Sequence, residues 1–385
     1  MQTKLPEQLI KTPQGQKADD ILRSCVHCGF CLATCPTYQL LGNELDSPRG
    51  RIYLIKSALE NNEFSQNSIQ HLDRCLTCRA CETTCPSGVE YSQLIEIGRE
   101  LVEKKRPLWQ KMARTSIRKL LTSPVLFNLL GSVAKHSSIQ TSSKVQQGQN
   151  KGRLLLLTGC VQPTLTPNTN HATKNVLATL GYEVIETPQK ECCGAIDQHN
   201  SAHNDALIKI KHNIDQWSNL LESGVDSIIS TASGCGVMVK DYPTLFEPDD
   251  AYYQKAVSVA SQTKDIAEFL LDQDLSTLSP VKEKISYHAP CSLQHGQKLP
   301  NLVEGLLEKL GYELMPITDA HLCCGSAGTY SIFQPKISKQ LRDNKLEHLT
   351  QSQPNLIVTS NIGCQIHLAK GTDLPIKHWI ELLDS

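Results

Sequence analysis

The sequence lacks any feature that would carry the chain into or through a membrane. No run of about 18 apolar residues occurs, so a transmembrane helix is not predicted. The polar start MQTKLPEQLIKTPQGQ has no apolar signal-peptide core. An excess of one charge is also absent, since 38 Lys and Arg face 39 Asp and Glu among 385 residues, and nucleic acid is therefore not an expected partner. We expect a cytoplasmic chain of two or three domains.

Cysteine, by contrast, is abundant. In a reducing cytosol 16 cysteines are better explained as metal ligands than as structural disulfides. Two stretches, CVHCGFCLATCP from residue 25 and CLTCRACETTCP from residue 75, share the spacing Cys-x2-Cys-x2-Cys-x3-Cys-Pro. When two such motifs occur together, three cysteines of each hold one iron-sulfur cluster and the fourth ligates the other cluster.

This crossed rule predicts the ligands of two [4Fe-4S] clusters. The first ferredoxin set consists of Cys25, Cys28, Cys31 and Cys85. The second ferredoxin set consists of Cys75, Cys78, Cys81 and Cys35. Structural zinc is the alternative, but zinc sites need only separated cysteine pairs, whereas these cysteines come as tight triplets plus one.

The spacer between the two motifs reads as helical. Ser47 is a candidate N-cap and Pro48 suits the first helical position. One face of this helix would hold Ile52, Ile55 and Leu59. With a further helix in YSQLIEIGRELVEKK, residues 1–104 are expected to form an α-helical ferredoxin domain. The ligands have arginine neighbours that could offset cluster charge or simply be solvated: Arg23, Arg74 and Arg79.

Residues 105–150 are expected to form a basic amphipathic linker, because no Asp or Glu occurs from Lys104 to Tyr182. An apolar stripe at helical spacing comprises Leu108, Trp109, Met112, Ile117, Leu120 and Leu121. The basic residues largely elsewhere on this helix are Lys111, Arg114, Arg118 and Lys119. Such a helix could lie on an anionic membrane surface. Packing against a partner subunit or this chain's own core is the interpretation we favour. The polar tail of the linker, from His136, is expected to be flexible.

The other cysteines form a second duplication. The first repeat set consists of Cys160, Cys192, Cys193 and Cys235. The second repeat set consists of Cys291, Cys323, Cys324 and Cys364. Cys192 follows Cys160 by 32 positions and Cys323 follows Cys291 by 32 positions, and LGYEVIE and LGYELMP precede the two Cys-Cys-Gly sequences. Every cysteine therefore belongs to one of two repeated patterns.

Each repeat alternates apolar strand-like runs with helical segments. The runs RLLLL, VDSIIS, KISY and NLIVTS each precede a cysteine, which predicts two α/β units with mainly parallel sheets. We expect a first cysteine-rich domain over 151–280 and a second over 281–385, so that the chain is an α+β multidomain protein. Cysteines just past strand ends should converge at one sheet edge, where Gly194 and Gly325 allow close backbone approach.

The repeats resemble the cysteine-rich domains of the heterodisulfide reductase B-subunit family. Joined to a two-cluster ferredoxin, they are similar to the iron-sulfur subunits of glycolate dehydrogenases, also called glycolate oxidases, through TASGCGVMVKDY, HLCCGSAGTY and SNIGCQIHLAKG. That family pattern closes with Cys-x2-Cys, but here its first position is Ala232 or Asn361. Unusual five-cysteine clusters are thus doubtful, although four thiolates per half still suffice for a further iron-sulfur cluster.

The resemblance implies an electron-transfer subunit without a catalytic residue of its own. No Gly-x-Gly-x-x-Gly sequence follows a strand, so FAD and substrate are expected on partners: an FAD-containing subunit oxidising glycolate to glyoxylate and a second flavoprotein-like subunit. Electrons would pass to a quinone or another acceptor from a position on the cytoplasmic face of the inner membrane. The alternatives are an equivalent subunit for lactate, glycerol 3-phosphate or succinate, a heterodisulfide-reductase-like catalytic subunit, and a zinc-dependent scaffold. The second repeat set also has four histidines nearby, to which we assign no role: His288, His295, His321 and His367.

Overall fold

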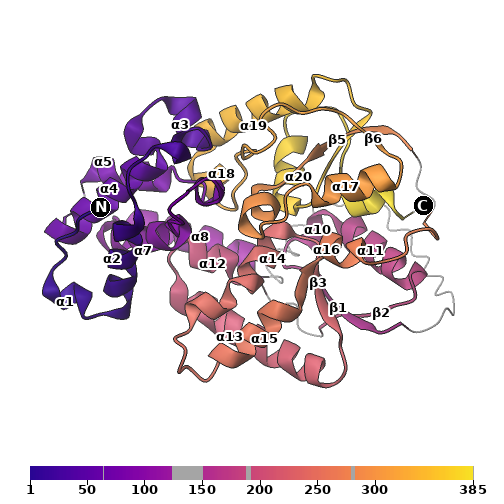
Figure 1. Ribbon diagram of the computed structural model, residues 1–385, viewed down its shortest axis with the longest axis horizontal. Helices are drawn as coiled ribbons and strands as arrows, with labels where there is room; N and C mark the ends of the chain where they lie inside the picture. The colour runs from indigo at the N-terminus through magenta and orange to yellow at the C-terminus, as the bar shows by residue number, and fades with distance from the viewer. Residues whose placement is uncertain (64, 124–150, 188–191, 279–281, 385) are drawn as a thin grey trace.

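The computed structural model describes residues 1–63, 65–123, 151–187, 192–278 and 282–384. A helical N-terminal region lies beside two sheet-containing halves (Figure 1). The predicted fold class, an α-helical ferredoxin domain followed by two α/β repeats, is confirmed. The polar tail predicted for the linker lies outside the described residues.

Short helices joined by the cysteine loops make up the N-terminal region. They are α1 (Glu7–Ile10), α2 (Pro13–Ser24), α3 (Pro36–Leu41), α4 (Pro48–Asn61), α5 (Gln66–Asp73), α6 (Ala80–Thr83) and α7 (Tyr91–Lys105), with 3-10 turns η1 (Phe30–Leu32) and η2 (Glu44–Asp46). Ser47 caps α4 as predicted, because its side chain accepts a hydrogen bond from the Gly50 amide. The apolar face of α4 packs against α7, and Ile55, Leu94 and Ile95 are fully buried there.

Each sheet-containing half has a four-stranded parallel sheet among its described residues. The first sheet has the order β2-β1-β3-β4, with strands β1 (Arg153–Leu157), β2 (Glu183–Ile185), β3 (Ser227–Ser230) and β4 (Thr263–Asp265). The second has the order β6-β5-β7-β8, with strands β5 (Lys284–His288), β6 (Glu313–Leu314), β7 (Leu356–Thr359) and β8 (Ile376–His378). The identical order confirms the internal repeat, and β1, β3, β5 and β7 are the four predicted strands.

Helices connect the parallel strands in both halves. The first half contains α10 (Gln162–Leu165), α11 (Pro167–Thr179), α12 (Ala195–His199), α13 (His203–Glu222), α14 (Ser233–Lys240), η4 (Tyr242–Leu245), α15 (Tyr253–Gln262) and α16 (Ile266–Leu271). The second contains the π-helical turn η5 (Ser292–Gly296), α17 (Leu302–Lys309), α18 (Tyr330–Phe333), α19 (Pro335–Thr350), α20 (Ile362–Ala369) and η6 (Trp379–Leu382). Leu156 and Ile229 of one half and Ile285 and Val358 of the other belong to one buried apolar cluster, so the halves share a core.

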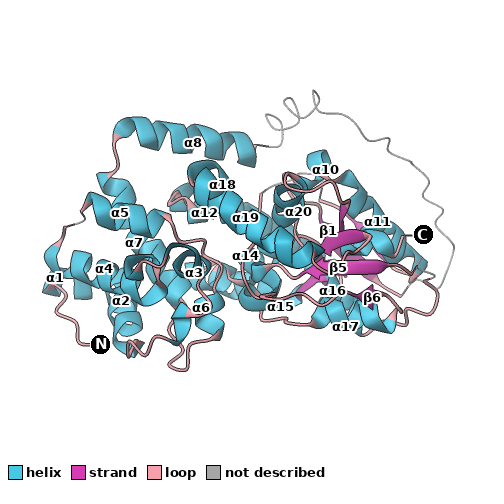
Figure 2. Cartoon of the chain, turned by 90° about the horizontal axis from the view of Figure 1, so that it is seen from above, coloured by secondary structure: helices cyan, strands magenta, loops and turns pink. Residues whose placement is uncertain are grey.

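Helix α8 (Leu108–Thr122) runs along one edge of the molecule (Figure 2) and contacts α12. It is held by its basic side: Arg118 bonds the buried carboxylate of Asp197 at 2.6 Å, and the Arg114 guanidinium lies 4.5 Å from the centre of the Phe333 ring. The apolar residues of its first turns, Leu108 and Trp109, stay exposed. Among the helices that the structure describes, none has the length and apolar character that a membrane span requires.

Candidate metal centre

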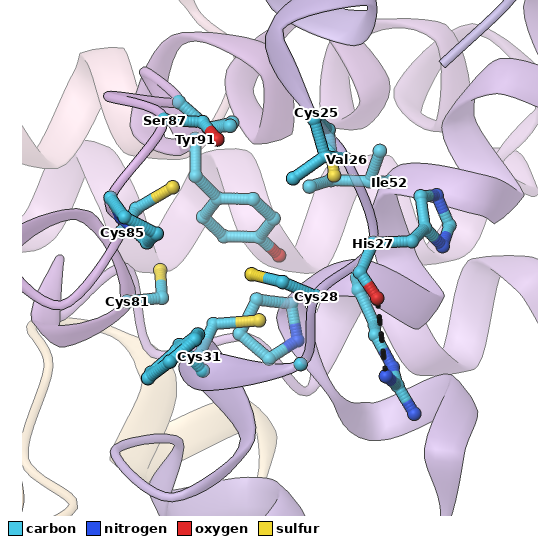
Figure 3. Close-up of a pocket in the computed structure, with 16 residues that line it drawn as sticks. Cys25, Val26, His27, Cys28, Cys31, Ile52, Cys81, Cys85, Ser87 and Tyr91 are labelled. Atoms are coloured by element: carbon cyan, nitrogen blue, oxygen red, sulfur yellow. Dashed lines mark hydrogen bonds between the residues drawn. The ribbon is translucent and has the colours of Figure 1, made fainter.

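All four cysteines of the first ferredoxin set line one pocket of the N-terminal region. Figure 3 shows Cys25, Cys28 and Cys31 on the first loop and Cys85 arriving from the second motif. Cys81 lines the same pocket. Gly29 has a φ of 87°, a left-handed conformation that lets the loop wind between two ligands. The structure thus places Cys85 beside the other motif's triplet, as the crossed assignment requires, while ligation itself stays a prediction.

The chemistry of this pocket suits an iron-sulfur cluster. Burial, together with the neighbouring thiols of Cys25 and Cys35, raises the pKa of Cys31 to about 11. Thiols packed in this way resist ionisation unless a cation is present, and a bound metal deprotonates a coordinating thiol. The pocket is otherwise mainly lined by apolar groups such as Ile52 and Val89, but Cys28 is exposed, so one side of a cluster would lie near the surface.

The second ferredoxin set is also brought together. Burial raises the pKa of Cys78 well above the usual value of a thiol, and the nearby thiols of Cys291, Cys35 and Cys75 add to that rise. Burial has the same effect on the pKa of Cys81, reinforced by its thiol neighbours. A cluster bound by this set would therefore lie close to Cys291 of the second repeat.

A buried charge network surrounds the second ferredoxin set. Asp46 accepts from His71 Nδ1 at 2.8 Å and Arg74 Nη1 at 3.0 Å, and it pairs with Arg51 at 3.4 Å. Arg51 is fully buried, and its Nη1 lies 4.0 Å from Cys35 Sγ. Arg51 was not predicted from the sequence; the available signal was a charged residue beside Ile52 on the apolar face of a helix.

Arginine charge changes the ionisation of a thiol in this set. Burial alone would raise the pKa of Cys75, but the positive charges of Arg51 and Arg99, together with hydrogen bonds from Thr77 and Tyr91, hold that pKa below its usual value. Backbone and side-chain donors also reach the Cys75 sulfur, from the Thr77 amide at 3.4 Å and the Tyr91 hydroxyl at 3.6 Å. Such donors stabilise a thiolate and tune a cluster that it ligates.

The arginines singled out from the sequence all pair with carboxylates. Arg23 bonds Asp19 at 2.6 Å on the surface. Arg74 belongs to the Asp46 network, and Arg79 bonds both Glu82 at 2.9 Å and Asp241 at 2.6 Å. Arg79 therefore joins the ferredoxin region to the first sheet-containing half, in addition to any influence on a cluster.

The two repeat sets open onto a common cavity of about 510 Å³ between the N-terminal region and the two halves. The cysteines that line this cavity are Cys75, Cys78, Cys160, Cys192, Cys193, Cys235, Cys291, Cys323, Cys324 and Cys364. The predicted convergence at the strand ends is therefore what the structure shows. Gly325, with a φ of 87°, brings its backbone so near α19 that an added Cβ would lie 2.6 Å from the Ser338 carbonyl oxygen.

Within each repeat set the thiols contact one another. Interaction with Cys160 and then Cys193 lowers the pKa of Cys192 well below that of an ordinary thiol, while the pKa of Cys160 is raised by the same contact. In the second set, Cys291 and Cys323 are 3.8 Å apart between sulfurs. Both sets can therefore supply thiolates to a metal or exchange electrons as dithiols.

The positions where the family pattern has a further cysteine are helix N-caps. Ala232 precedes α14 and Asn361 precedes α20. The Asn361 side-chain amide donates to Cys364 Sγ at 3.6 Å. Neither position supplies a thiol, so each repeat set keeps four sulfurs.

The histidines near the second set have different environments. His295 bonds Thr83 at 2.9 Å, and His367 bonds the Ser338 side chain at 3.2 Å. His288 is buried, and burial followed by the charge of Lys345 lowers its pKa well below the usual value, so its imidazole is neutral.

Comparisons with known proteins agree with this architecture. Residues 21–89 match the 4Fe-4S dicluster domain, and residues 154–240 and 285–369 match the cysteine-rich domain named for Cys-Cys-Gly. These matches define the class: an iron-sulfur protein with a two-cluster domain and two cysteine-rich repeats.

Similar proteins of known name indicate which iron-sulfur proteins of this class the chain resembles. The chain is 47% identical to the glycolate oxidase iron-sulfur subunit of Escherichia coli K12 over 100% of this chain and 98% of that relative. It is 30% identical to the probable glycolate oxidase iron-sulfur subunit of Bacillus subtilis 168, over 91% and 89% of the two chains. A subunit of the fumarate reductase (CoM/CoB) of Methanothermobacter marburgensis is 26% identical, over 97% and 74%. The chain belongs to the family of glycolate oxidase iron-sulfur subunits.

Proposed function

We propose that this chain is the electron-transfer subunit of a flavin-dependent glycolate dehydrogenase. An FAD-bearing partner, accompanied by a second flavoprotein-like subunit, oxidises glycolate to glyoxylate, which releases two protons and two electrons. Iron-sulfur clusters, when bound, accept and pass on these electrons one at a time. The full-length similarity to glycolate oxidase iron-sulfur subunits supports this substrate.

The proposed electron route rests on a contact between the second ferredoxin set and the second repeat set. Cys78 of the second ferredoxin set packs in the same apolar cluster as Cys323 and Cys291 of the second repeat set. Tyr330, in that cluster, donates from its hydroxyl to the Arg74 carbonyl oxygen at 3.2 Å and so ties the two regions together. We assign the two ferredoxin sets as ligands of the two [4Fe-4S] clusters, which gives electrons a route from the first set through the second to the cavity.

The chain's own residues position and insulate this route. Arg51 and Arg99 supply positive charge next to thiolates of the second set, and Arg79 holds the ferredoxin region against Asp241. We also propose that the domains span residues 1–104, 105–150, 151–280 and 281–385. A further iron-sulfur cluster in the repeats is likewise a proposal.

The experiment is to copurify the chain with its partners without air and to measure dye reduction with glycolate, lactate, glycerol 3-phosphate and succinate. Glycolate should be the preferred substrate. In a Cys78→Ser complex, glycolate should still reduce flavin in a single turnover, whereas dye reduction should fall at least about tenfold. Activity with lactate but not glycolate would refute the substrate, and unchanged dye reduction in Cys78→Ser would refute the relay.

We further propose that α8 attaches the complex to the cytoplasmic face of the inner membrane, near a quinone acceptor. Leu108, Trp109 and Met112 are 77%, 69% and 70% exposed, and they are flanked by exposed Lys104 and Lys105. An apolar face with a basic rim matches an anionic lipid surface. From the sequence we favoured packing of this helix against a partner subunit or the chain's own core. Such packing occurs on the opposite face of α8, where Arg118 is buried against Asp197.

Vesicle flotation tests this attachment, with phosphatidylglycerol vesicles compared with phosphatidylcholine vesicles. The other two tryptophans, Trp217 and Trp379, are buried, so brominated lipid should quench mainly Trp109. The double variant Leu108→Ser and Met112→Ser should lose binding, whereas Ile208→Ser, which alters an exposed apolar residue elsewhere, should retain it. The lipid-binding role of α8 would be refuted if the double variant bound vesicles as well as the unchanged protein does. It would also be refuted if the unchanged protein bound no vesicles, and the exposed face of α8 would then be assigned to a protein partner.

A further inference from the structure

The most unusual buried polar group of the second half is the imidazole of His288, the last residue of β5. Its side chain is 2% exposed, and neither ring nitrogen has a hydrogen-bond partner among the described residues. Buried polar atoms are almost always paired, so two unpaired ring nitrogens point to a missing partner such as a water molecule or a metal ion. The buried His378, by comparison, uses both ring nitrogens, toward Thr231 and Ile380.

Two buried thiols lie next to this imidazole. One ring nitrogen of His288 and the sulfurs of Cys324 and Cys364 all lie within 4.8 Å of one another. Three different elements supply them: the end of β5, the Cys-Cys-Gly loop and the first turn of α20. The cluster therefore exists only in the folded chain and has no local sequence signal.

The spacing suits a single metal ion. Two thiolates that each lie about 2.3 Å from one ion are about 3.8 Å apart at the tetrahedral angle, and an imidazole nitrogen binds at about 2.0 Å. A set of ligand atoms within 4.8 Å of one another needs little movement to close on one ion. Mixed nitrogen and sulfur ligands in this geometry favour zinc or ferrous iron over harder cations.

The cluster has a closed side and an open side. Cys324 and Cys364 line the large cavity, whereas His288 is not among its lining residues and lies behind them. With three protein ligands, a fourth coordination position would face the cavity, where Cys323 also lies. Metal sites with an open position bind water or a substrate group there.

The internal repeat provides a comparison within the same chain. His288 stands three positions before Cys291, and the equivalent residue three positions before Cys160 is Leu157. These two residues end the equivalent strands β5 and β1. The first half therefore lacks the nitrogen ligand and cannot form the same site.

We propose that the second half binds one thiolate-preferring transition-metal ion, zinc or ferrous iron, through His288, Cys324 and Cys364, with its fourth position open to the cavity. The site is separate from the two ferredoxin sets, and because it uses Cys324 and Cys364 it leaves a further iron-sulfur cluster to the first repeat set. It does not depend on glycolate as the substrate, because its tests measure metal content and coordination rather than turnover.

The test is elemental analysis of zinc, iron and acid-labile sulfide in the full chain, purified with its partners without air, together with X-ray absorption at the edge of the metal found. His288→Leu, which copies the first half, should remove about one zinc, or about one iron without sulfide, per chain. The first coordination shell of the wild-type ion should contain imidazole nitrogen beside sulfur. His367→Asn, which changes a buried histidine with a protein partner, should retain the ion.

A second variant distinguishes ligation from simple loss of fold. His288→Cys should keep the ion and replace its nitrogen scattering by sulfur, which a purely structural role of the imidazole would not produce. Full metal content in His288→Leu, or no nitrogen in the wild-type shell, would overturn the proposal. Loss of about four irons together with four sulfides in His288→Leu would also overturn it, because His288 would then support a cluster instead of one ion.

Discussion

Arg51 should set the reduction potential of the cluster held by the second ferredoxin set. Its Nη1 is 4.0 Å from Cys35 Sγ, and the side chain is fully buried. Two unit charges 4 Å apart interact by about 4 kcal/mol at an effective dielectric constant of about 20. On reduction, the added electron spreads over the whole cluster, so its mean distance from the Arg51 charge is about 8 Å. At that distance the interaction energy is about 2 kcal/mol, which we use here.

Replacing Arg51 by Met removes this charge and keeps the length of the side chain. Because 59 mV corresponds to about 1.4 kcal/mol for one electron, the potential of one cluster should fall by about 85 mV, with about 170 mV as the limit. Asp46 retains His71 and Arg74 as partners, so the fold should survive.

An anaerobic redox titration followed by electron paramagnetic resonance measures both cluster potentials. Arg51→Lys keeps the charge and should recover most of the shift, while Arg23→Gln, on the surface, should change neither potential. An intact Arg51→Met protein with both potentials unchanged would refute the electrostatic argument. An equal fall in Arg51→Lys would instead assign the effect to hydrogen bonding.

Three further changes test other parts of the structure. Cys35→Ser should remove the same resonance signal as Cys78→Ser and leave the signal lost in Cys28→Ser, because Cys35 belongs to the second ferredoxin set; the reverse pattern would contradict the crossed assignment. Burial lowers the pKa of His378 to about 4, so the folded state binds fewer protons than the unfolded state, whose histidine titrates near 6.5. His378 alone should therefore contribute about 2 kcal/mol of stability that is present above pH 6.5 and lost by pH 5. Denaturant unfolding measures this loss, and His378→Gln should remove this part of the pH dependence. Gly325→Ala should lower the free energy of unfolding by about 2 kcal/mol or more, because the new Cβ combines a φ of 87° with a clash. Gly328→Ala, which has a positive φ but open space around it, should lower this free energy by about half as much. Equal losses of stability in thermal unfolding would exclude the clash.

Much of the fold could be predicted because its signals are local. The Ser47 cap and the buried face of α4 follow from neighbouring residues, and so do the four apolar strands that precede the repeat cysteines. The position of the repeat cysteines just past strand ends also indicated that they converge, and the cavity that they line confirms this.

Long-range pairings could not be predicted in the same way. Helical periodicity gives α8 two faces but does not say which one is buried, because the partner of Arg118, Asp197, comes 79 positions later. His288 likewise meets Cys324 and Cys364 only after the second half has folded. Such contacts depend on tertiary packing, for which a single sequence provides no local pattern.

The position of Cys85 in the pocket of the first motif has a consequence during synthesis. Cys85 leaves the ribosome 54 positions after Cys31, which at about 5 to 20 residues per second is a delay of roughly 3 to 11 seconds. Through that interval the fourth ligand that the crossed assignment gives the first triplet is missing, although Cys35 has already emerged. Under the proposed ligation, the nascent chain must wait for both motifs before either cluster can be completed, so cofactor delivery and folding of the first hundred residues become a single event.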